Sequence, residues 1–313
     1  MCAGRRIARV ALVGLANSGK STLCNALVGE RVSIATAKRH TTRDNVRGVF
    51  TDGQSQTQVV ITDTPGVLEL DAASRRERAR DGGREFKTMQ ARALDALLQS
   101  DVHLLVVDAA AIDSHARLRH TARELSRVCA LAAEPGTAHR SILGVMNKTD
   151  LFESETEPSE SEMGRLGELE TLFLEEAAVP CARVFRTSAL TGAGVAPLRA
   201  TLVALARPGP WAFEDSAQRT DLTLGERAVE AVRAETFTAL HREMPYAVRQ
   251  GAPQWREGRD GTLSLALELT VPRSSQLQVL RRALPRIAKG ARPEIERLFD
   301  RRVRLMLQAR QRS

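Results

Sequence analysis

Cysteine, aromatic residues and long apolar runs are all scarce in this 313-residue chain. The four cysteines lie far apart, without a CxxC pair or a histidine couplet nearby, so neither a zinc site nor a disulfide framework is indicated. No run approaches the roughly 18 apolar residues of a membrane span, and we expect no stable membrane insertion. Only 4% of the residues are aromatic, which argues against nucleic-acid binding by stacked side chains. The remaining composition is typical of a globular chain of about two domains.

The positive charge of the chain is concentrated near its C-terminus. Lysine and arginine number 46 against 38 aspartate and glutamate, a formal net charge of +8. Residues 1–218 contain 27 charges of each sign, so the whole excess follows residue 218. Such a basic field attracts phosphate backbones, and on charge alone it also suits acidic proteins or lipid surfaces.

Apolar strand-like runs alternate with helical stretches over the first two thirds of the chain. The runs cover residues 7–14, 59–63, 103–108, 142–147 and 182–187. This alternation predicts an α/β fold with a mainly parallel sheet and helices on both faces. Pro208, Gly209 and Pro210 interrupt the rhythm, so we place a linker at 207–219, between one domain at 1–206 and another at 220–313.

The second domain has a different pattern. Residues 220–243 show helical spacing, with apolar side chains on one side at Leu224, Ala228, Val232, Phe237 and Leu240. Residues 262–271 and 303–309 alternate between apolar and other residues, and each predicts a strand. Residues 274–299 are interpreted as two short helices, the second starting near Arg292. The predicted order is α, β, β, α, α, β, an α+β domain.

A glycine-rich motif lies where the first apolar strand meets a helix. Residues 14–21, GLANSGKS, match GxxxxGK[ST]. The backbone N–H groups of such a loop surround a β-phosphate, Lys20 reaches phosphate oxygens, and the Ser21 hydroxyl ligates Mg²⁺. We therefore predict a nucleotide site that contains Gly14, Asn17, Ser18, Gly19, Lys20, Ser21 and Thr22.

Two further motifs indicate the base. Asn147-Lys148-Thr149-Asp150 follows a buried strand and matches NKxD. The Asp150 carboxylate can accept both N1–H and N2–H₂ of guanine, a pair of donors that adenine lacks. Asn147 would support the loop and the base edge, and the Lys148 stem would lie across the ring. A main-chain N–H for guanine O6 would come from the SAL sequence at Ser188, Ala189 and Leu190.

A fourth motif, DTPG at residues 63–66, predicts hydrolysis of the γ-phosphate. In DxxG elements the aspartate, here Asp63, holds Mg²⁺ through water, and the glycine N–H, here Gly66, contacts the γ-phosphate. Of the pair Thr41 and Thr42 we favour Thr42 as the switch threonine that ligates Mg²⁺. The predicted catalytic residues are Asn17, Lys20, Thr42 and Gly66, and the predicted metal ligands are Ser21, Thr42 and Asp63.

Six short sequences carry a family resemblance: GLANSGKST, TTRD, DTPG, NKTD, SAL and, at residues 244–246, MPY. Through them the chain resembles the Era family of GTPases over nearly its whole length. The resemblance implies a P-loop GTPase domain followed by a type II KH domain, with GTP or GDP and Mg²⁺ as ligands. It also implies binding to the 3′ region of small-subunit ribosomal RNA and a role in small-subunit maturation. The implied partners include proteins of the precursor subunit, which the chain would join as a monomer.

Val67 and Asn17 bear on the rate of hydrolysis. In Ras-type GTPases a glutamine at the position of Val67 orients the attacking water, so we expect slow intrinsic hydrolysis here. The resemblance implies that relatives with an apolar residue there can use a K⁺ ion held by the P-loop asparagine. Asn17 occupies that position, so we predict stimulation by K⁺. The alternative is that Asn17 only supports the loop.

The GxxG turn with which KH domains clamp a nucleic-acid backbone is missing. Gln278-Val279-Leu280-Arg281 stands in its expected place, between the two predicted helices. Side-chain charge would replace the clamp, from the basic residues Arg281, Arg282, Arg286 and Lys289, unless these form only a solvated face. The alternative function is therefore a GTP-switched scaffold that binds ribosomal proteins without contact between KH domain and RNA.

The same departures bear on the compartment. The missing GxxG, the acidic insertion at 153–162 and the loop around 109–140 resemble a divergent organellar family member. We therefore expect the mitochondrial matrix, with the bacterial cytoplasm as the alternative. Because the first strand starts almost at Met1, any targeting presequence has been removed or left out of this sequence.

Overall fold

The computed structural model divides the chain into two compact units. One unit contains the described residues up to 221, and the other contains the described residues from 222 onwards. The residues that the structure describes are 4–33, 46–64, 91, 93–112, 119–121, 141–152, 164, 167–168, 170–171, 183–241 and 244–312. In this part of the chain no helix combines the length and the apolar character needed to cross a membrane.

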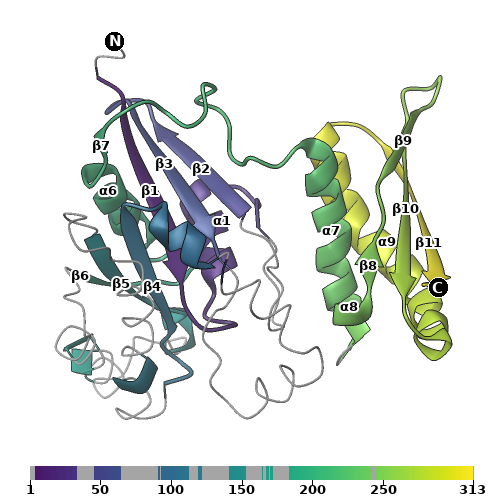
Figure 1. Ribbon diagram of the computed structural model, residues 1–313, viewed down its shortest axis with the longest axis horizontal. Helices are drawn as coiled ribbons and strands as arrows, with labels where there is room; N and C mark the ends of the chain where they lie inside the picture. The colour runs from purple at the N-terminus through teal and green to yellow at the C-terminus, as the bar shows by residue number, and fades with distance from the viewer. Residues whose placement is uncertain are drawn as a thin grey trace. The chain divides into compact units, whose positions relative to one another are not determined.

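The first unit is built on a seven-stranded sheet in the order β2-β3-β1-β4-β5-β6, with β7 paired to β1 (Figure 1). Its strands are β1 (Arg6–Val13), β2 (Val46–Asp52), β3 (Thr57–Asp63), β4 (Val102–Asp108), β5 (Ser141–Asn147), β6 (Arg183–Arg186) and β7 (Arg207–Pro208). Strand β1 runs parallel to β3 and β4, and β5 runs parallel to β4 and β6. Only β2 and β7 pair in the antiparallel sense. The predicted mainly parallel sheet is thus confirmed, whereas β2 and β7 were not predicted.

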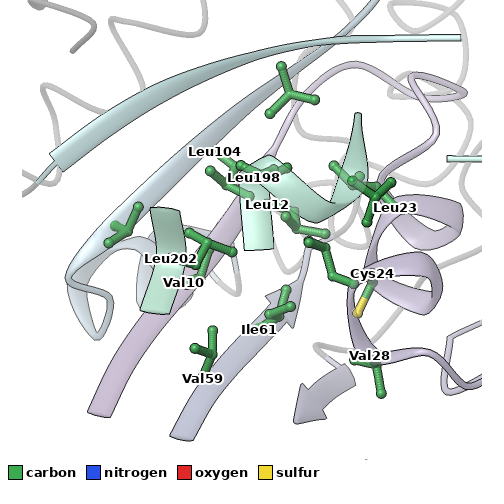
Figure 2. Packing of buried hydrophobic residues seen from close by; sticks show 14 of the residues in the cluster. Val10, Leu12, Leu23, Cys24, Val28, Val59, Ile61, Leu104, Leu198 and Leu202 are labelled. Carbon is green, nitrogen blue, oxygen red and sulfur yellow. The ribbon is translucent and has the colours of Figure 1, made fainter. Parts of the chain in front are cut away.

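Helices α1 (Lys20–Val28) and α6 (Val195–Ala204) contribute to one buried cluster with the central strands. Figure 2 shows Leu23 of α1 and Leu198 of α6 among side chains of β1 such as Leu12. All three leucines are fully buried, and each contributes about 1.5–3 kcal/mol to folding. This packing fixes the start of α1 at the carboxyl ends of the parallel strands, where ligands of open α/β sheets bind.

The segment 207–219, predicted as a linker, lies against the first unit. Gln58 of β3 is fully buried, and its side chain forms hydrogen bonds with the main chain of this segment. Its Oε1 accepts the N–H groups of Ala212 and Phe213 at 2.8 and 3.0 Å, and its Nε2 donates to the Phe213 carbonyl at 2.9 Å. Phe213 also packs on the apolar cluster of Ile7, Val49 and Val60.

The second unit is a mixed sheet with two long helices packed on one face (Figure 1). Its elements are α7 (Leu224–Ala239), α8 (Met244–Ala247), β8 (Arg249–Gln250), β9 (Gln254–Glu257), β10 (Leu263–Val271), α9 (Ser274–Phe299) and β11 (Val303–Gln311). Strands β10 and β11 are parallel, and β8 and β9 pair with β10 in the antiparallel sense. The core joins Val232 of α7, Leu267 of β10 and Ile287 of α9. An α+β unit was predicted here.

Two local predictions in this unit are wrong. Residues 274–299 form one continuous helix, α9, instead of two short ones, and Pro285 and Pro293 both lie inside it. No glycine interrupts Gln278–Arg281, and the buried residues of α9 recur at helical spacing along its length: Leu280, Ile287, Ala291 and Ile295. Leu224, predicted on the buried side of α7, is 46% exposed because it is the first residue of that helix.

Candidate functional site

The predicted phosphate loop connects the end of β1 to the start of α1. Lys20 is buried, and its Nζ donates to the carbonyl oxygens of Gly14 at 3.0 Å and Leu15 at 2.7 Å. Asn17 and Gly19 have φ angles of 63° and 89°, in the left-handed region. No side chain caps α1 at Gly19. The positive end of the α1 dipole therefore lies at the phosphate loop, where it favours an anion.

Two glycines of this loop are required by close packing. A Cβ atom at Gly14 would lie 2.3 Å from the carbonyl oxygen of Val106, at the end of β4. A Cβ atom at Gly19 would lie 2.2 Å from Nδ2 of Asn147. Both distances are far below van der Waals contact, so the motif glycines allow the loop to pack directly on its neighbours.

Ser21 and Asp63 come together at the carboxyl ends of β1 and β3. The Ser21 hydroxyl donates to Asp63 Oδ2 at 2.6 Å, and the Asp63 residue is fully buried. Mg²⁺ binds hard oxygen ligands, commonly one or two carboxylates together with phosphate oxygens and water, so this pair fits Mg²⁺. The described residues contain no cluster of three or more His, Cys, Asp or Glu side chains that could hold a metal ion by itself.

Ser33 belongs to the same cluster and was not predicted. Its hydroxyl donates to Asp63 Oδ2 at 2.5 Å. The Oδ1 atom of Asn25 accepts the N–H groups of Val32 and Ser33 at 2.8 and 2.9 Å, and so fixes this segment after α1. Ser33 lies outside every motif, and no pattern in the sequence indicates it.

Cys24 lies one turn beyond Ser21 and is fully buried. Burial, and to a smaller extent the nearby charge of Asp63, raises the pKa of the Cys24 thiol well above its ordinary value of 9.0. The thiol therefore stays protonated and packs as a small apolar group in the core shown in Figure 2.

Asn147 connects three of the predicted motifs. Its Nδ2 donates to the carbonyl oxygen of Ser18, in the phosphate loop, at 3.0 Å. Its Oδ1 accepts the Thr187 hydroxyl at 3.2 Å and the N–H of Ala189, in the SAL segment, at 3.0 Å. With 1% of its surface exposed, this side chain fixes the NKTD loop, the SAL segment and the phosphate loop relative to one another.

Lys148 is held by a residue that the sequence analysis missed. Its φ is 66°, and its Nζ forms a 2.6 Å ion pair with Oδ2 of Asp108. Asp108 Oδ1 in turn accepts the N–H groups of Ala110 and Ala111 at 3.1 and 3.2 Å. The signal for Asp108 was present, because it ends a buried parallel strand directly opposite Asn147 in the register of β4 and β5.

Asp150 Oδ1 and Ser18 Oγ are buried polar atoms of this site that have no hydrogen-bond partner in the described part of the chain. Buried oxygens are normally bonded, so an unbonded carboxylate oxygen is one that a ligand donor can satisfy. Asp150 lies in the short helix η1 (Thr149–Leu151), directly after the end of β5. In the SAL segment, the Ser188 N–H donates to the Ala193 carbonyl at 3.0 Å, and Leu190 is 80% exposed.

The remaining predicted residues divide into two groups. Thr42, Gly66 and Val67 lie outside the described residues. The four predicted RNA-binding residues are all exposed on α9, but Arg286 differs from the others because its guanidinium donates to the Ala239 carbonyl at the end of α7. Arg286 therefore also has a structural contact, whereas Arg281, Arg282 and Lys289 form no ion pair among the described residues.

These features define the class: a P-loop GTPase domain, with its motifs at the carboxyl edge of a parallel sheet, followed by a KH-like unit. A family model described as 50S ribosome-binding GTPase matches residues 9–148. The chain is 34% identical to GTPase Era of Maricaulis maris, over 97% of this chain and 91% of that protein. It is 31% identical to GTPase Era of Brucella suis, over 95% of this chain and 86% of that protein. The chain therefore belongs to the Era family of GTPases.

Two crystal structures are similar over both units. One is Era in complex with MgGDPNP and nucleotides 1506–1542 of 16S ribosomal RNA, with a TM-score of 0.77 and 25% identity. The other is a variant of Aquifex aeolicus Era bound to GDP.AlF4-, with a TM-score of 0.79 and 26% identity. Each comparison covers 98% of this chain and 94% of the other. The predicted fold class, a GTPase domain followed by a KH-like domain, is confirmed.

Proposed function

We propose that this chain binds GTP and GDP with Mg²⁺, hydrolyses GTP and binds small-subunit ribosomal RNA near its 3′ end to assist maturation of the small subunit. The observation that carries the nucleotide half is the Asn147 junction. This junction supports a single site that combines the phosphate loop with the unbonded Asp150 Oδ1, the type of hydrogen-bond acceptor that guanine requires.

Each predicted residue of the nucleotide site has a role in this proposal. Gly14, Asn17, Ser18, Gly19, Lys20 and Thr22 hold the phosphates, and Lys20 exchanges its bonds to loop carbonyls for phosphate oxygens. Ser21 and Asp63 hold Mg²⁺ together with Thr42, and Gly66 contacts the γ-phosphate. The guanine base is bound by Asn147, Lys148, Asp150 and the SAL segment, Ser188 to Leu190.

Titration calorimetry with GDP and ADP tests the nucleotide half. We expect the wild-type chain to bind GDP and not ADP, and Asp150→Asn to lose GDP affinity and to gain affinity for XDP. The reason is that the amide donates a hydrogen bond to the xanthine carbonyl where the carboxylate accepted one from the guanine amine. Equal affinity of the wild-type chain for ADP and GDP would overturn the proposal.

K⁺ stimulation is a separate part of the proposal. Asn17 lies in the left-handed turn of the phosphate loop, and its side chain is exposed. We expect faster GTP turnover in KCl than in NaCl, and loss of this difference in Asn17→Ala. Equal turnover in the two salts would leave Asn17 with the role of supporting the loop.

The RNA half is supported by the net charge of +8 and by the similar Era structure that holds nucleotides 1506–1542 of 16S ribosomal RNA. The second candidate function is a GTP-switched scaffold that binds ribosomal proteins without contact between KH domain and RNA. The continuous helix α9 favours it, because it leaves no turn for a main-chain clamp. Crosslinking that joins residues 276–312 to ribosomal RNA would exclude the scaffold.

The cellular setting completes the proposal. The relatives reported above are bacterial, which favours the bacterial alternative over the mitochondrial matrix. In this setting the chain acts as a monomer on the precursor small subunit and contacts its ribosomal proteins as well as its RNA.

A further inference from the structure

The sheet of the second unit has a face that points away from its helices. Along β10 the buried residues alternate with Ser264, Ala266, Glu268 and Thr270, which are partly exposed. Because successive side chains of a strand point to opposite faces, these residues lie on the outer side of the sheet. This surface, together with its neighbours on β8, β9 and β11, is called the outer sheet face below.

The strand register places arginines on both sides of β10 on this face. Ser264 lies opposite Arg256 of β9 and Arg304 of β11. Thr270 lies opposite Arg249 of β8 and Arg310 of β11. All four arginines are exposed. They form two cross-strand pairs, with small β10 side chains between the members of each pair.

The acidic residues near these arginines do not neutralise the face. Glu268 of β10 forms a 3.2 Å ion pair with Arg310. Asp260, in the turn between β9 and β10, also experiences the charge of Arg304. Among the described residues, Arg249, Arg256 and Arg304 form no ion pair. Three arginines on one open surface are thus available to an anionic partner.

The spacing suits an extended anionic chain. Neighbouring strands lie about 4.8 Å apart, so the two arginines of a pair are separated by about 10 Å across β10. Ser264 and Thr270 are six positions apart, so the two pairs are separated by about 20 Å along the strand. Within each pair the β10 side chain between the arginines is small, Ser264 or Thr270, and a guanidinium binds phosphate oxygens in a bidentate manner.

We propose that the outer sheet face, through Arg249, Arg256, Arg304 and Arg310, is an RNA-binding surface that contacts the phosphate backbone. The proposal rests on the proposed RNA-binding function and assigns it a surface other than the basic side of α9. Helix α9 is continuous where a KH domain carries its glycine turn, so residues 278–281 lie inside the helix and their main-chain N–H groups are not offered to a phosphate. Charge complementarity favours RNA over a protein partner, because phosphates supply closely and regularly spaced negative charge.

Two matched pairs of substitutions test the surface, with an RNA of nucleotides 1506–1542 of 16S ribosomal RNA as the probe. The first variant carries Arg256→Gln and Arg304→Gln on the outer sheet face. The second carries Arg281→Gln and Arg282→Gln on α9 and loses the same charge. All four side chains are exposed, and circular dichroism checks that both variants remain folded.

We expect the sheet variant to bind the RNA about tenfold more weakly, with a logarithmic salt slope smaller by about two, because two phosphate contacts are lost. The α9 variant should lose less affinity, and less of the salt slope, than the sheet variant. If only the α9 variant loses affinity, the surface proposal is wrong and the proposed RNA-binding function stands. If wild type does not bind the RNA, both are overturned. Unchanged RNA affinity in the sheet variant would also refute the proposal, and the face would then suit an acidic protein.

Discussion

At the scale of single residues, the Asn147 side chain determines how the site is organised. Its amide bonds the Ser18 carbonyl on one side and the Ala189 N–H on the other, at 3.0 Å each. The NKxD motif predicts a role at the base, and the structure shows that the same amide also supports the phosphate loop. That second contact could not be predicted from the sequence, because it depends on the spacing between the ends of β1 and β5.

Asp108 allows a test of positioning at this scale. We expect Asp108→Ala to weaken GDP binding by about tenfold or more, because Lys148 loses a charge-assisted bond worth roughly 1.5–3 kcal/mol. Asp108 acts through Lys148 in this account. In a Lys148→Ala background, the same substitution should therefore have much less effect. Calorimetric affinities of the two single variants and the double variant measure this.

Asp101 is the matched control for Asp108. It precedes the opposite end of β4, where its Oδ2 accepts the Arg9 N–H at 3.1 Å. Asp101→Ala should leave GDP affinity unchanged. Equal effects of Asp108→Ala with and without Lys148 would show that Asp108 does not act through the lysine.

At the scale of elements, the start of α7 is stabilised by a reciprocal cap. The Thr223 N–H and hydroxyl donate to the Glu226 carboxylate at 2.8 and 2.7 Å, and the Thr223 hydroxyl accepts the Glu226 N–H at 3.2 Å. The bond from the Thr223 N–H, followed by that from its hydroxyl, lowers the pKa of Glu226 below its ordinary 4.5. The sequence TLGE at residues 223–226 matches TxxE, the pattern that is typical of such a capping box.

The pKa shift makes the cap dependent on pH. A carboxylate with a lowered folded-state pKa stabilises the fold above the unfolded-state value, and this contribution is lost as the pH falls through the folded value. We expect Thr223→Ala to cost about 1 kcal/mol near neutral pH and distinctly less in acid. Hydrogen exchange of the α7 amides measures both. An equal cost at both pH values would show that Glu226 does not contribute.

Helix α9 provides a second test at this scale, because Val279 and Leu280 are adjacent in sequence but differ in burial. Leu280 is fully buried, whereas Val279 is 47% exposed. We expect Leu280→Ala to destabilise the second unit by about 2–5 kcal/mol and Val279→Ala by less than about 1 kcal/mol. Denaturant unfolding followed by Trp255 fluorescence, with Trp211 replaced by Phe, reports on this unit. Equal costs would contradict a continuous helix in this register.

The elements also show where sequence reasoning succeeds and where it ends. The five predicted strands of the first unit are confirmed; four of them, β1, β3, β4 and β5, are mostly apolar runs buried along most of their length, and β6 buries Val184 and Phe185. Strand β2, VRGVFTD, was missed because Arg47, Gly48 and Asp52 interrupt its apolar pattern, and its partner β3 supplies the context. The sequence predicts two helices over 274–299 because Pro293 suggests a helix start. The structure has one helix, α9, which tolerates that proline in its interior.

At the scale of the whole molecule, charge is segregated by unit. Residues 1–218 sum to zero, whereas the remainder of the chain carries the entire +8. The two proposed ligands should therefore respond differently to salt. RNA binding releases counterions from the phosphate backbone, with a slope of about 0.7–0.9 per phosphate contacted, whereas interactions at a buried site are much less screened.

We therefore expect a rise in NaCl from about 50 to about 200 mM to weaken RNA binding at least tenfold and GDP binding by less than about threefold. Fluorescence anisotropy with labelled RNA and with labelled GDP, at a fixed Mg²⁺ concentration, measures both on the same preparation. The KCl concentration is kept constant and only NaCl is added, so that any effect of K⁺ at Asn17 remains separate from electrostatic screening. A parallel decline of the two affinities would mean that the basic C-terminal unit does not act as a separate electrostatic surface for RNA.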